Sequence, residues 1–177
     1  STYGGAMYGS DAYNCNFTGN TATEKGGAIY DGEAINCTFI GNSAENGGAM
    51  YGGAINCTFK QNTATNYGGA IYQSEAYNST FTQNTATEGG AIYEGYAENC
   101  NFTQNTAYYY YGAMYGYAEK CNFNKNSAIE AIGAMTGYAY NCNFTENTAY
   151  NCGALDYGTA INCTFIGNSA ENGGAMY

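Results

Sequence analysis

The chain lacks several residue types altogether, and most of its charged residues are acidic. Its 177 residues include no proline, tryptophan, histidine or arginine, and four lysines stand against 14 acidic residues, for a formal net charge of −10. Without a basic stripe to neutralise phosphates, the chain is a poor partner for nucleic acid or an anionic membrane. No apolar run approaches the ~20 residues that span a bilayer, so we expect no membrane insertion of this segment.

Phenylalanine is also scarce, but its positions are regular. The gaps between its eight occurrences are 22, 20, 22, 21, 21, 21 and 21 residues, and an asparagine follows each one after two intervening residues. The unit around this pair is close to G-G-A-[I/M]-Y-x-G-x-A-x-N-C-[T/N]-F-x-x-N-[T/S]-A-x-x. Such a fixed period predicts a solenoid, in which each repeat buries its apolar face against its neighbours. The eight are Phe17, Phe39, Phe59, Phe81, Phe102, Phe123, Phe144 and Phe165.

The unit favours short strands over helices, because glycine pairs recur along the chain and no i, i+3, i+4 apolar series survives between them. We predict an all-β fold, a right-handed parallel β-helix with about 21 residues per coil, eight or nine coils and three short strands in each. With a bend between Ala34 and Phe39, each coil would bury one Ile or Met, two Ala, one Cys, one Phe and one Asn. The Asn42 column should form an amide ladder, because like residues stack on like.

A longer repeat overlies the short one. Residues 161–177 repeat residues 35–51 letter for letter, an offset of 126 residues or six periods of 21. We therefore expect residues 1–177 to form one repetitive β-helix and to be a segment of a longer array with a super-repeat of six coils.

The motifs resemble a known repeat class. The pairing of GGA[I/L/V] with FxxN, present as GGAIY at 26–30 and FIGN at 39–42, resembles the repeats of chlamydial polymorphic outer membrane proteins. The segment NCTFIGNSAENGGAMY is also similar to adhesin-like surface proteins of methanogenic archaea. The resemblance covers essentially the whole chain. It implies a secreted or surface-attached β-helix, used for adhesion or as a stalk.

Many polysaccharide lyases and hydrolases are β-helices too, and their chemistry needs acidic residues, or lysine and arginine, clustered on one face. Here three aspartates and eleven glutamates are scattered, mostly singly, among the coils. No P-loop, nucleophile elbow or calcium-binding GGxGxD repeat occurs. We therefore expect no enzymatic activity and no cofactor.

Seven of the eight cysteines occupy one position, two residues before phenylalanine, where one repeat has Ser79 instead. A spacing near 21 residues, with no histidine, is unlike a metal or redox motif. Small buried thiols that fill the core are the favoured interpretation, and vertical disulfides such as Cys142 with Cys163 are the alternative. Cys152 replaces the first glycine of a GGA motif, as a crosslinking thiol or a simple substitution. The cysteine column comprises Cys15, Cys37, Cys57, Cys100, Cys121, Cys142 and Cys163.

An Asn-x-Ser/Thr sequon occurs once in seven of the eight coils, at positions expected to face outward. The asparagine precedes the cysteine position in some coils and follows it in others, yet each of these seven coils has one sequon. This indicates one N-linked glycan per coil, with a strand-face preference for Thr and Asn as the alternative. Sugars stacked every ~4.8 Å would crowd, so we expect partial occupancy. The candidates are Asn16, Asn36, Asn56, Asn78, Asn101, Asn143 and Asn162.

Tyrosine follows the aliphatic residue of most coils and predicts a second outward column, interrupted by Thr136 and Asp156. Such a strip either binds sugars or a neighbouring fibre through its rings, or its rings stack on one another and stiffen the coil. Threonine pairs in TAT at 21–23, 63–65 and 85–87 are similar to ice-binding faces, but the register decays to SAE, TAY and SAI, which disfavours ice binding. The tyrosine column comprises Tyr8, Tyr30, Tyr51, Tyr72, Tyr93, Tyr115 and Tyr177.

The sequence as a whole favours a non-enzymatic extracellular or cell-surface structural protein. We expect a glycosylated β-helical fibre or stalk that assembles by coil stacking, with other copies of itself and covalent N-linked glycans as its partners. The alternative is an adhesin that binds cell-surface glycans through the tyrosine column.

Overall fold

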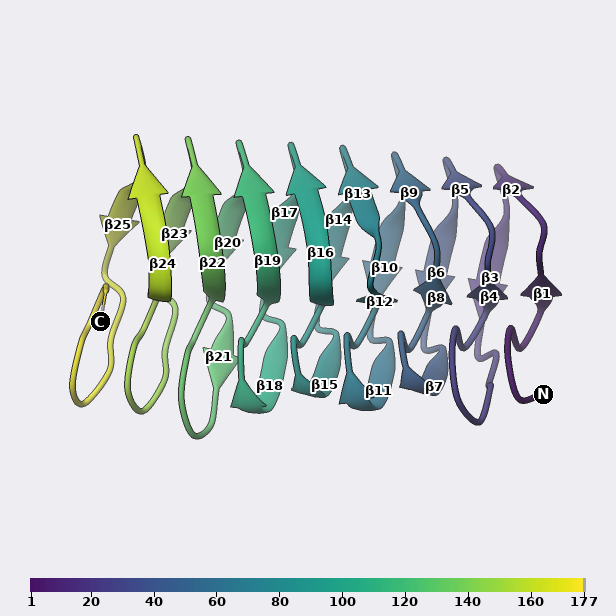
Figure 1. The fold of residues 1–177 in the computed structure, drawn as a ribbon, viewed down its shortest axis with the longest axis horizontal. Helices are drawn as coiled ribbons and strands as arrows, with labels where there is room; N and C mark the ends of the chain where they lie inside the picture. The colour runs from purple at the N-terminus through teal and green to yellow at the C-terminus, as the bar shows by residue number, and fades with distance from the viewer. Residues whose placement is uncertain (177) are drawn as a thin grey trace.

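A computed structural model describes residues 1–176 as a stack of coils built from parallel β-strands (Figure 1). Each coil contributes to sheets on its different sides, and like strands of successive coils pair with one another. In Figure 1 the chain rises through the front sheet, descends through the sheet behind it and closes through the lower loops, while it advances from right to left. This path is a right-handed parallel β-helix, as the sequence predicts.

The first sheet, which we call the tyrosine sheet, runs through eight coils. In coils 1–4 it consists of two short strands per coil, and from coil 5 onward these merge into one strand. The paired strands are β1 (Met7–Tyr8) and β2 (Ala12–Tyr13), β4 (Ile29–Tyr30) and β5 (Ala34–Ile35), β8 (Met50–Tyr51) and β9 (Ala54–Ile55), and β12 (Ile71–Tyr72) and β13 (Glu75–Tyr77). The merged strands are β16 (Ile92–Glu98), β19 (Met114–Glu119), β22 (Met135–Tyr140) and β24 (Leu155–Ile161).

The second sheet, the phenylalanine sheet, has one strand from each of the eight coils. Its strands are β3 (Asn16–Thr18), β6 (Thr38–Ile40), β10 (Thr58–Lys60), β14 (Thr80–Thr82), β17 (Asn101–Thr103), β20 (Asn122–Asn124), β23 (Asn143–Thr145) and β25 (Thr164–Ile166). The strands are in register, so that Phe59 pairs with Phe39 on one side and with Phe81 on the other. The period of the sequence is therefore the period of the coil.

The third sheet, the threonine sheet, is shorter than predicted. It contains β7 (Ser43–Asn46), β11 (Thr63–Tyr67), β15 (Thr85–Glu88), β18 (Thr106–Tyr110) and β21 (Ser127–Ala128). Beyond these strands the third side continues only as isolated bridges, such as Thr21 with Ser43 and Ser127 with Thr148. The third strand is thus regular in coils 2–6. Residues 1–176 contain no helix, and hence none with the length and apolar character of a membrane span.

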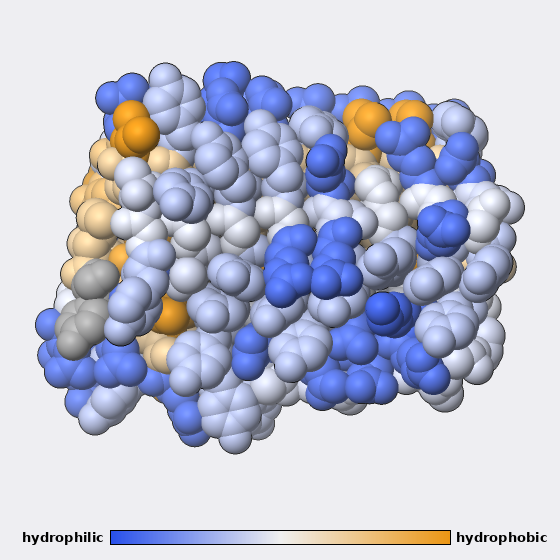
Figure 2. All heavy atoms as spheres, viewed as in Figure 1, coloured by the Kyte–Doolittle hydropathy of each residue, from blue (hydrophilic) through white to orange (hydrophobic). Residues whose placement is uncertain are grey.

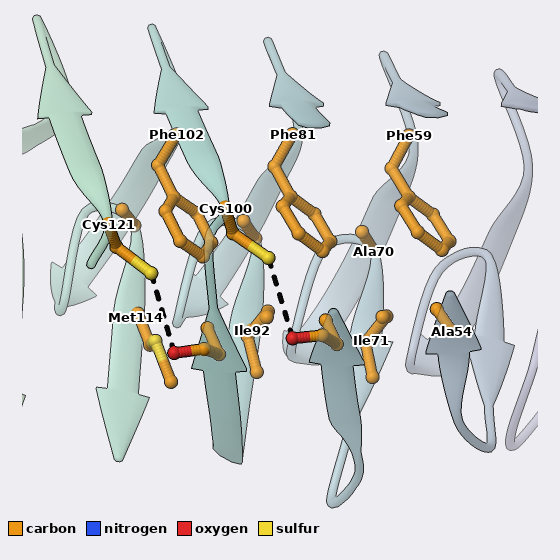
Figure 3. Packing of buried hydrophobic residues seen from close by; sticks show 14 of the residues in the cluster. Ala54, Phe59, Ala70, Ile71, Phe81, Ile92, Cys100, Phe102, Met114 and Cys121 are labelled. Carbon is orange, nitrogen blue, oxygen red and sulfur yellow. Dashed lines mark hydrogen bonds between the residues drawn. The ribbon is translucent and has the colours of Figure 1, made fainter. Parts of the chain in front are cut away.

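The core is a set of columns that run along the axis (Figure 3). The phenylalanine rings stack face to face, with centroids 4.7 to 4.9 Å apart and interplanar angles between 2° and 10°. Figure 3 shows Phe59, Phe81 and Phe102 in this arrangement above the aliphatic column that includes Ile92 and Met114. The predicted inward positions are confirmed, because these side chains are fully buried.

The structure buries one more alanine per coil than the two predicted. Ala49 and Met50 are neighbours in sequence, yet both are fully buried. Their backbone N–H groups donate to the same carbonyl oxygen, that of Ala70, at 3.0 and 2.9 Å. The chain therefore turns a corner here, and strict in-out alternation along a strand does not hold at that corner.

The asparagine column forms the predicted amide ladder. Asn62 Nδ2 donates to Asn84 Oδ1 at 3.0 Å and to the Phe39 carbonyl oxygen at 3.1 Å. Asn62 Oδ1 accepts from both the backbone N–H and the side-chain amide of Asn42, each at 3.0 Å. Because both amide hydrogens and both acceptor directions are used, a fully buried amide carries no desolvation penalty for unpaired groups.

The second glycine of each GGA motif is required by the stacking itself. A Cβ added at Gly69 would collide with the backbone carbonyl oxygen of Gly90 in the next coil. This position is glycine in all of the coils, whereas the first glycine of the motif is replaced in three of them. The replacements are Tyr111, Ile132 and Cys152.

Replacing Asn84 by alanine tests the ladder. The substitution leaves two donors of Asn62 without their acceptor and the Phe59 carbonyl oxygen without its donor. Since a buried unpaired group costs about 1–3 kcal/mol, we expect Asn84→Ala to lower the free energy of unfolding by at least about 2 kcal/mol in urea titrations. Asn101→Ala, on the exposed face of the next coil, should change it by less than about 0.5 kcal/mol. Equal effects of the two substitutions would contradict the ladder's role.

Candidate functional site

The tyrosine column lies on the outer face of the tyrosine sheet, as predicted, but it is less exposed than a binding strip would be. Tyr8 is 65% exposed, whereas its equivalents in the next five coils are half-buried. Successive rings lie 5.1 to 6.0 Å apart, and three of the five pairs are stacked. The half-buried members are Tyr30, Tyr51, Tyr72, Tyr93 and Tyr115, and Tyr177 lies outside the described residues.

Side chains from the third side of the coil and from the turn that follows it cover much of the column. Tyr67 packs against Tyr93 with a centroid distance of 4.5 Å, and Tyr111 stacks on Tyr115 at 5.0 Å. The ammonium group of Lys25 lies 5.1 Å from the ring centroid of Tyr51, a cation–π contact. The ring faces are therefore used within the molecule, which favours a stiffening role of the column over a sugar-stacking one.

Burial also affects the phenol groups. Desolvation, followed by the negative charge of Glu88, raises the pKa of Tyr111 to about 12. Desolvation likewise raises the pKa of Tyr72 and of Tyr93 above the ordinary value. The phenol groups of Tyr72, Tyr93 and Tyr111 are therefore neutral at physiological pH and add no charge to an acidic surface.

The two interruptions of the column lie next to each other in space. In the register of β19, β22 and β24, Tyr115 pairs with Thr136, and Thr136 pairs with Asp156. Asp156 is buried although its side chain is ionisable, with 5% of its surface exposed. Sequence reasoning found this break but gave it no role.

All seven sequon asparagines are exposed, and they fall into two structural groups. Asn16, Asn101 and Asn143 begin strands of the phenylalanine sheet. The other group lies at the predicted bend before that sheet, where the backbone is left-handed with φ between 51° and 56°. This group comprises Asn36, Asn56, Asn78 and Asn162.

The surroundings of these asparagines differ. In the strand group, Asn143 Nδ2 donates to Asn122 Oδ1 at 2.9 Å, so the nitrogen that would carry a sugar already has a partner. In the bend group, Asn36, Asn56 and Asn78 lie on three successive coils, which places their side chains about 4.8 Å apart along the axis. Asn162 has the Asn-Cys-Thr sequon of Asn36 and Asn56, but the equivalent position of the preceding coil has no sequon.

The cysteine column faces the core, and its members are thiols in the structure. In Figure 3 the thiol groups of Cys100 and Cys121 donate to the carbonyl oxygens of Ala76 and Ala97, each at 3.4 Å. Ser79 takes the same place with a 2.8 Å bond from its hydroxyl to the Tyr77 carbonyl oxygen. Small hydrogen-bonded thiols that fill the core are therefore the arrangement seen.

Two details of the cysteines bear on the sequence predictions. Cys15, in the first coil, is exposed and Cys163 is half-buried, yet each thiol bonds the carbonyl oxygen two residues before it, as the buried Cys37 does. The vertical disulfide stays a prediction, and neighbouring column positions do follow one another in register, as the 3.4 Å bond from Cys121 N to Cys142 Sγ shows. Cys152 is fully buried, which favours the simple substitution over the crosslinking thiol.

Acidic residues do not assemble into a metal site in the part of the chain that the structure describes. No three histidine, cysteine, aspartate or glutamate side chains of residues 1–176 converge as ligands. Lys120 bridges Glu119 at 2.8 Å and Glu98 at 3.2 Å, and its side chain is 49% exposed. Exposed pairs of this kind contribute little to stability.

Comparison with known families identifies a model that matches the repeat. Residues 14–31, 56–74 and 78–93 match the model of the Chlamydia polymorphic membrane protein repeat. Each match begins at the bend before a phenylalanine strand and ends in or beside the next GGA-I-Y segment. No curated protein matches the chain. The resemblance to chlamydial repeats is confirmed, while the similarity to methanogen surface proteins stays a prediction.

The chain is typical of a surface repeat protein, because its coils stack through hydrogen-bond ladders and its repeats match this family model. Three segments of the chain match the polymorphic membrane protein repeat, and all three lie on the β-solenoid.

Thiol labelling tests the cysteine column. Burial raises the pKa of the Cys57 thiol to about 11, so at pH 8 it is both shielded and protonated. In the native protein we expect Cys15 to react with iodoacetamide at least about a hundredfold faster than Cys57 or Cys121, because modification of a buried thiol needs opening of the coil. In denaturant, all eight cysteines should react. A total below eight would instead establish vertical disulfides.

Proposed function

We propose that the chain is part of a non-enzymatic extracellular stalk or fibre. In this proposal it is a stiff rod that projects from the cell and carries N-linked glycans. The observation that carries this proposal is the orientation of the hydrogen bonds. The backbone ladders of all three sheets and the asparagine ladder run from coil to coil along the axis. A load or bend along the rod is therefore resisted by every ladder at once.

Assembly by coil stacking follows from the equivalence of the coil interfaces. Asn42 with Asn62 and Asn126 with Asn147 make the same pair of bonds, although they lie at different heights in the stack. A coil of another chain that presents the same columns meets the same complementary groups. The identity of residues 35–51 and 161–177 supports such interchangeability.

A glycan sheath is supported by the exposure of all seven sequon asparagines. The two groups occupy positions two residues apart in the repeat, on either side of the cysteine position. The adhesin alternative, in which the tyrosine column stacks host sugars, is less favoured because the rings of the column pack on one another and on Tyr67 and Tyr111.

Material purified from its native source without denaturant tests the proposal. We expect filaments longer than one chain by electron microscopy, and sugar mass on several sequons by glycopeptide mass spectrometry. Peptides must extend beyond the identical segments 35–51 and 161–177 so that Asn36 and Asn162 are distinguished. Because neighbouring sugars crowd one another, we expect higher glycan occupancy at Asn162 than at Asn56. The two have the same sequon, but Asn56 has sequons at the equivalent position of both neighbouring coils.

A matched variant sharpens this comparison. Thr58→Ala removes the Asn56 sequon and should raise occupancy at Asn36 and Asn78 if neighbouring sugars compete for space. Unmodified asparagines throughout would contradict the glycan sheath. Single globular particles of one chain would contradict assembly by coil stacking.

A further inference from the structure

The break in the tyrosine column opens a cavity on the outer face of the tyrosine sheet. Thr136 and Asp156 occupy two successive positions of the column, and each is smaller than the ring it replaces. The cavity has a volume of about 480 Å³ and is lined on its sides by Tyr115, Tyr138 and Tyr157. Tyr115 is the last ring of the regular column before the break, so its far face has no column ring on it.

The cavity has an apolar floor that the regular coils lack. Where those coils carry the first glycine of GGA, three successive coils carry Tyr111, Ile132 and Cys152. Ile132 and Cys152 form a small hydrophobic cluster of their own, against which Tyr111 packs. Figure 2 shows apolar surface in a hollow where β22 and β24 begin. Tyr111 and Ile132 line the cavity. The two coils that lack a column ring, those of Thr136 and Asp156, are also the coils that carry Ile132 and Cys152.

Two polar atoms at this break are buried without a partner among the described residues. They are Oδ1 of Asp156 and Oγ1 of Thr136. Both residues line the cavity. Burial raises the pKa of the Asp156 carboxyl group above its usual range. A buried unpaired carboxylate oxygen is costly, so a group that supplies hydrogen-bond donors there would be bound favourably.

We propose that this cavity binds a neutral saccharide unit. Sugar hydroxyl groups donate to the Asp156 carboxylate, and they both donate to and accept from the Thr136 hydroxyl. The C–H face of the ring packs against the tyrosine side walls. The stalk function does not require this site, so the proposal goes beyond it and stands or falls separately.

Other ligands fit the same groups less well. An ammonium ion would pair with Asp156 and contact the tyrosine rings, but it offers no acceptor for the hydroxyl hydrogen of Thr136. An acidic sugar would bring a negative charge to a carboxylate on a chain with a net charge of −10. A cavity of about 480 Å³ also exceeds what a small cation fills and lies within the range of small-molecule sites.

Calorimetric titration of the 177-residue chain tests the proposal. The probes are maltose, cellobiose, lactose and diacetylchitobiose, with tetramethylammonium chloride as the cation probe. We expect at least one disaccharide to bind saturably at one site per chain. Asp156→Asn should weaken it about tenfold, because a hydrogen bond to a charged acceptor becomes a neutral one. Asp156→Tyr, which restores the column residue, should abolish binding.

Tyr51→Thr is the matched control, because it makes in the regular column the change that the chain carries at position 136. It should leave the affinity unchanged. Thermal unfolding of each variant separates loss of the site from loss of the fold. The proposal is overturned if no disaccharide binds or if only the cation binds. It is also overturned if Tyr51→Thr weakens binding as much as Asp156→Asn does, or if Asp156→Asn lowers stability without changing affinity.

Discussion

Hydrogen bonding between coils is the constraint on which the rest of this structure depends. A single coil pairs almost none of its backbone with itself; its N–H and carbonyl groups meet those of the coils on either side. The asparagine ladder extends the rule to a side chain, since each internal amide is satisfied only by groups of the neighbouring coils. The period must then stay near 21 residues, because a coil of another length would lose register on every face at once.

The outer face is free to vary, because the ladders do not depend on it. Sequon asparagines fall into two groups, and the tyrosine column is interrupted where Thr136 and Asp156 replace its rings. The second glycine of GGA, at a corner of the coil, does not vary, because a side chain there would collide with the backbone of the next coil. The chain thus combines an interior that varies little, apart from small changes such as Ser79 for cysteine, with an exterior that differs from coil to coil.

Much of the fold could be predicted from the sequence, because the repeat occurs eight times and each copy indicates the same inward positions. The burial of Ala49 could not, since it depends on a corner at which two adjacent residues face inward. Nor could the half-burial of the tyrosine column, because Tyr67 and Tyr111 reach it from other sides of the coil. The cavity at Asp156 was marked only by coincident irregularities, the missing rings and the missing first glycines, whose nearness appears once the coils are stacked.

Adding a coil tests most directly whether contacts between coils carry the fold. Residues 85–105 form one period from the centre of the stack, and inserting a second copy after residue 105 preserves every column. Stability in such an array is approximately a sum of coil and interface contributions. We predict cooperative unfolding at a higher urea midpoint for the lengthened chain, and loss of cooperativity when only half a period is inserted at the same place. An unchanged or lower midpoint for the full-period insertion would contradict the account.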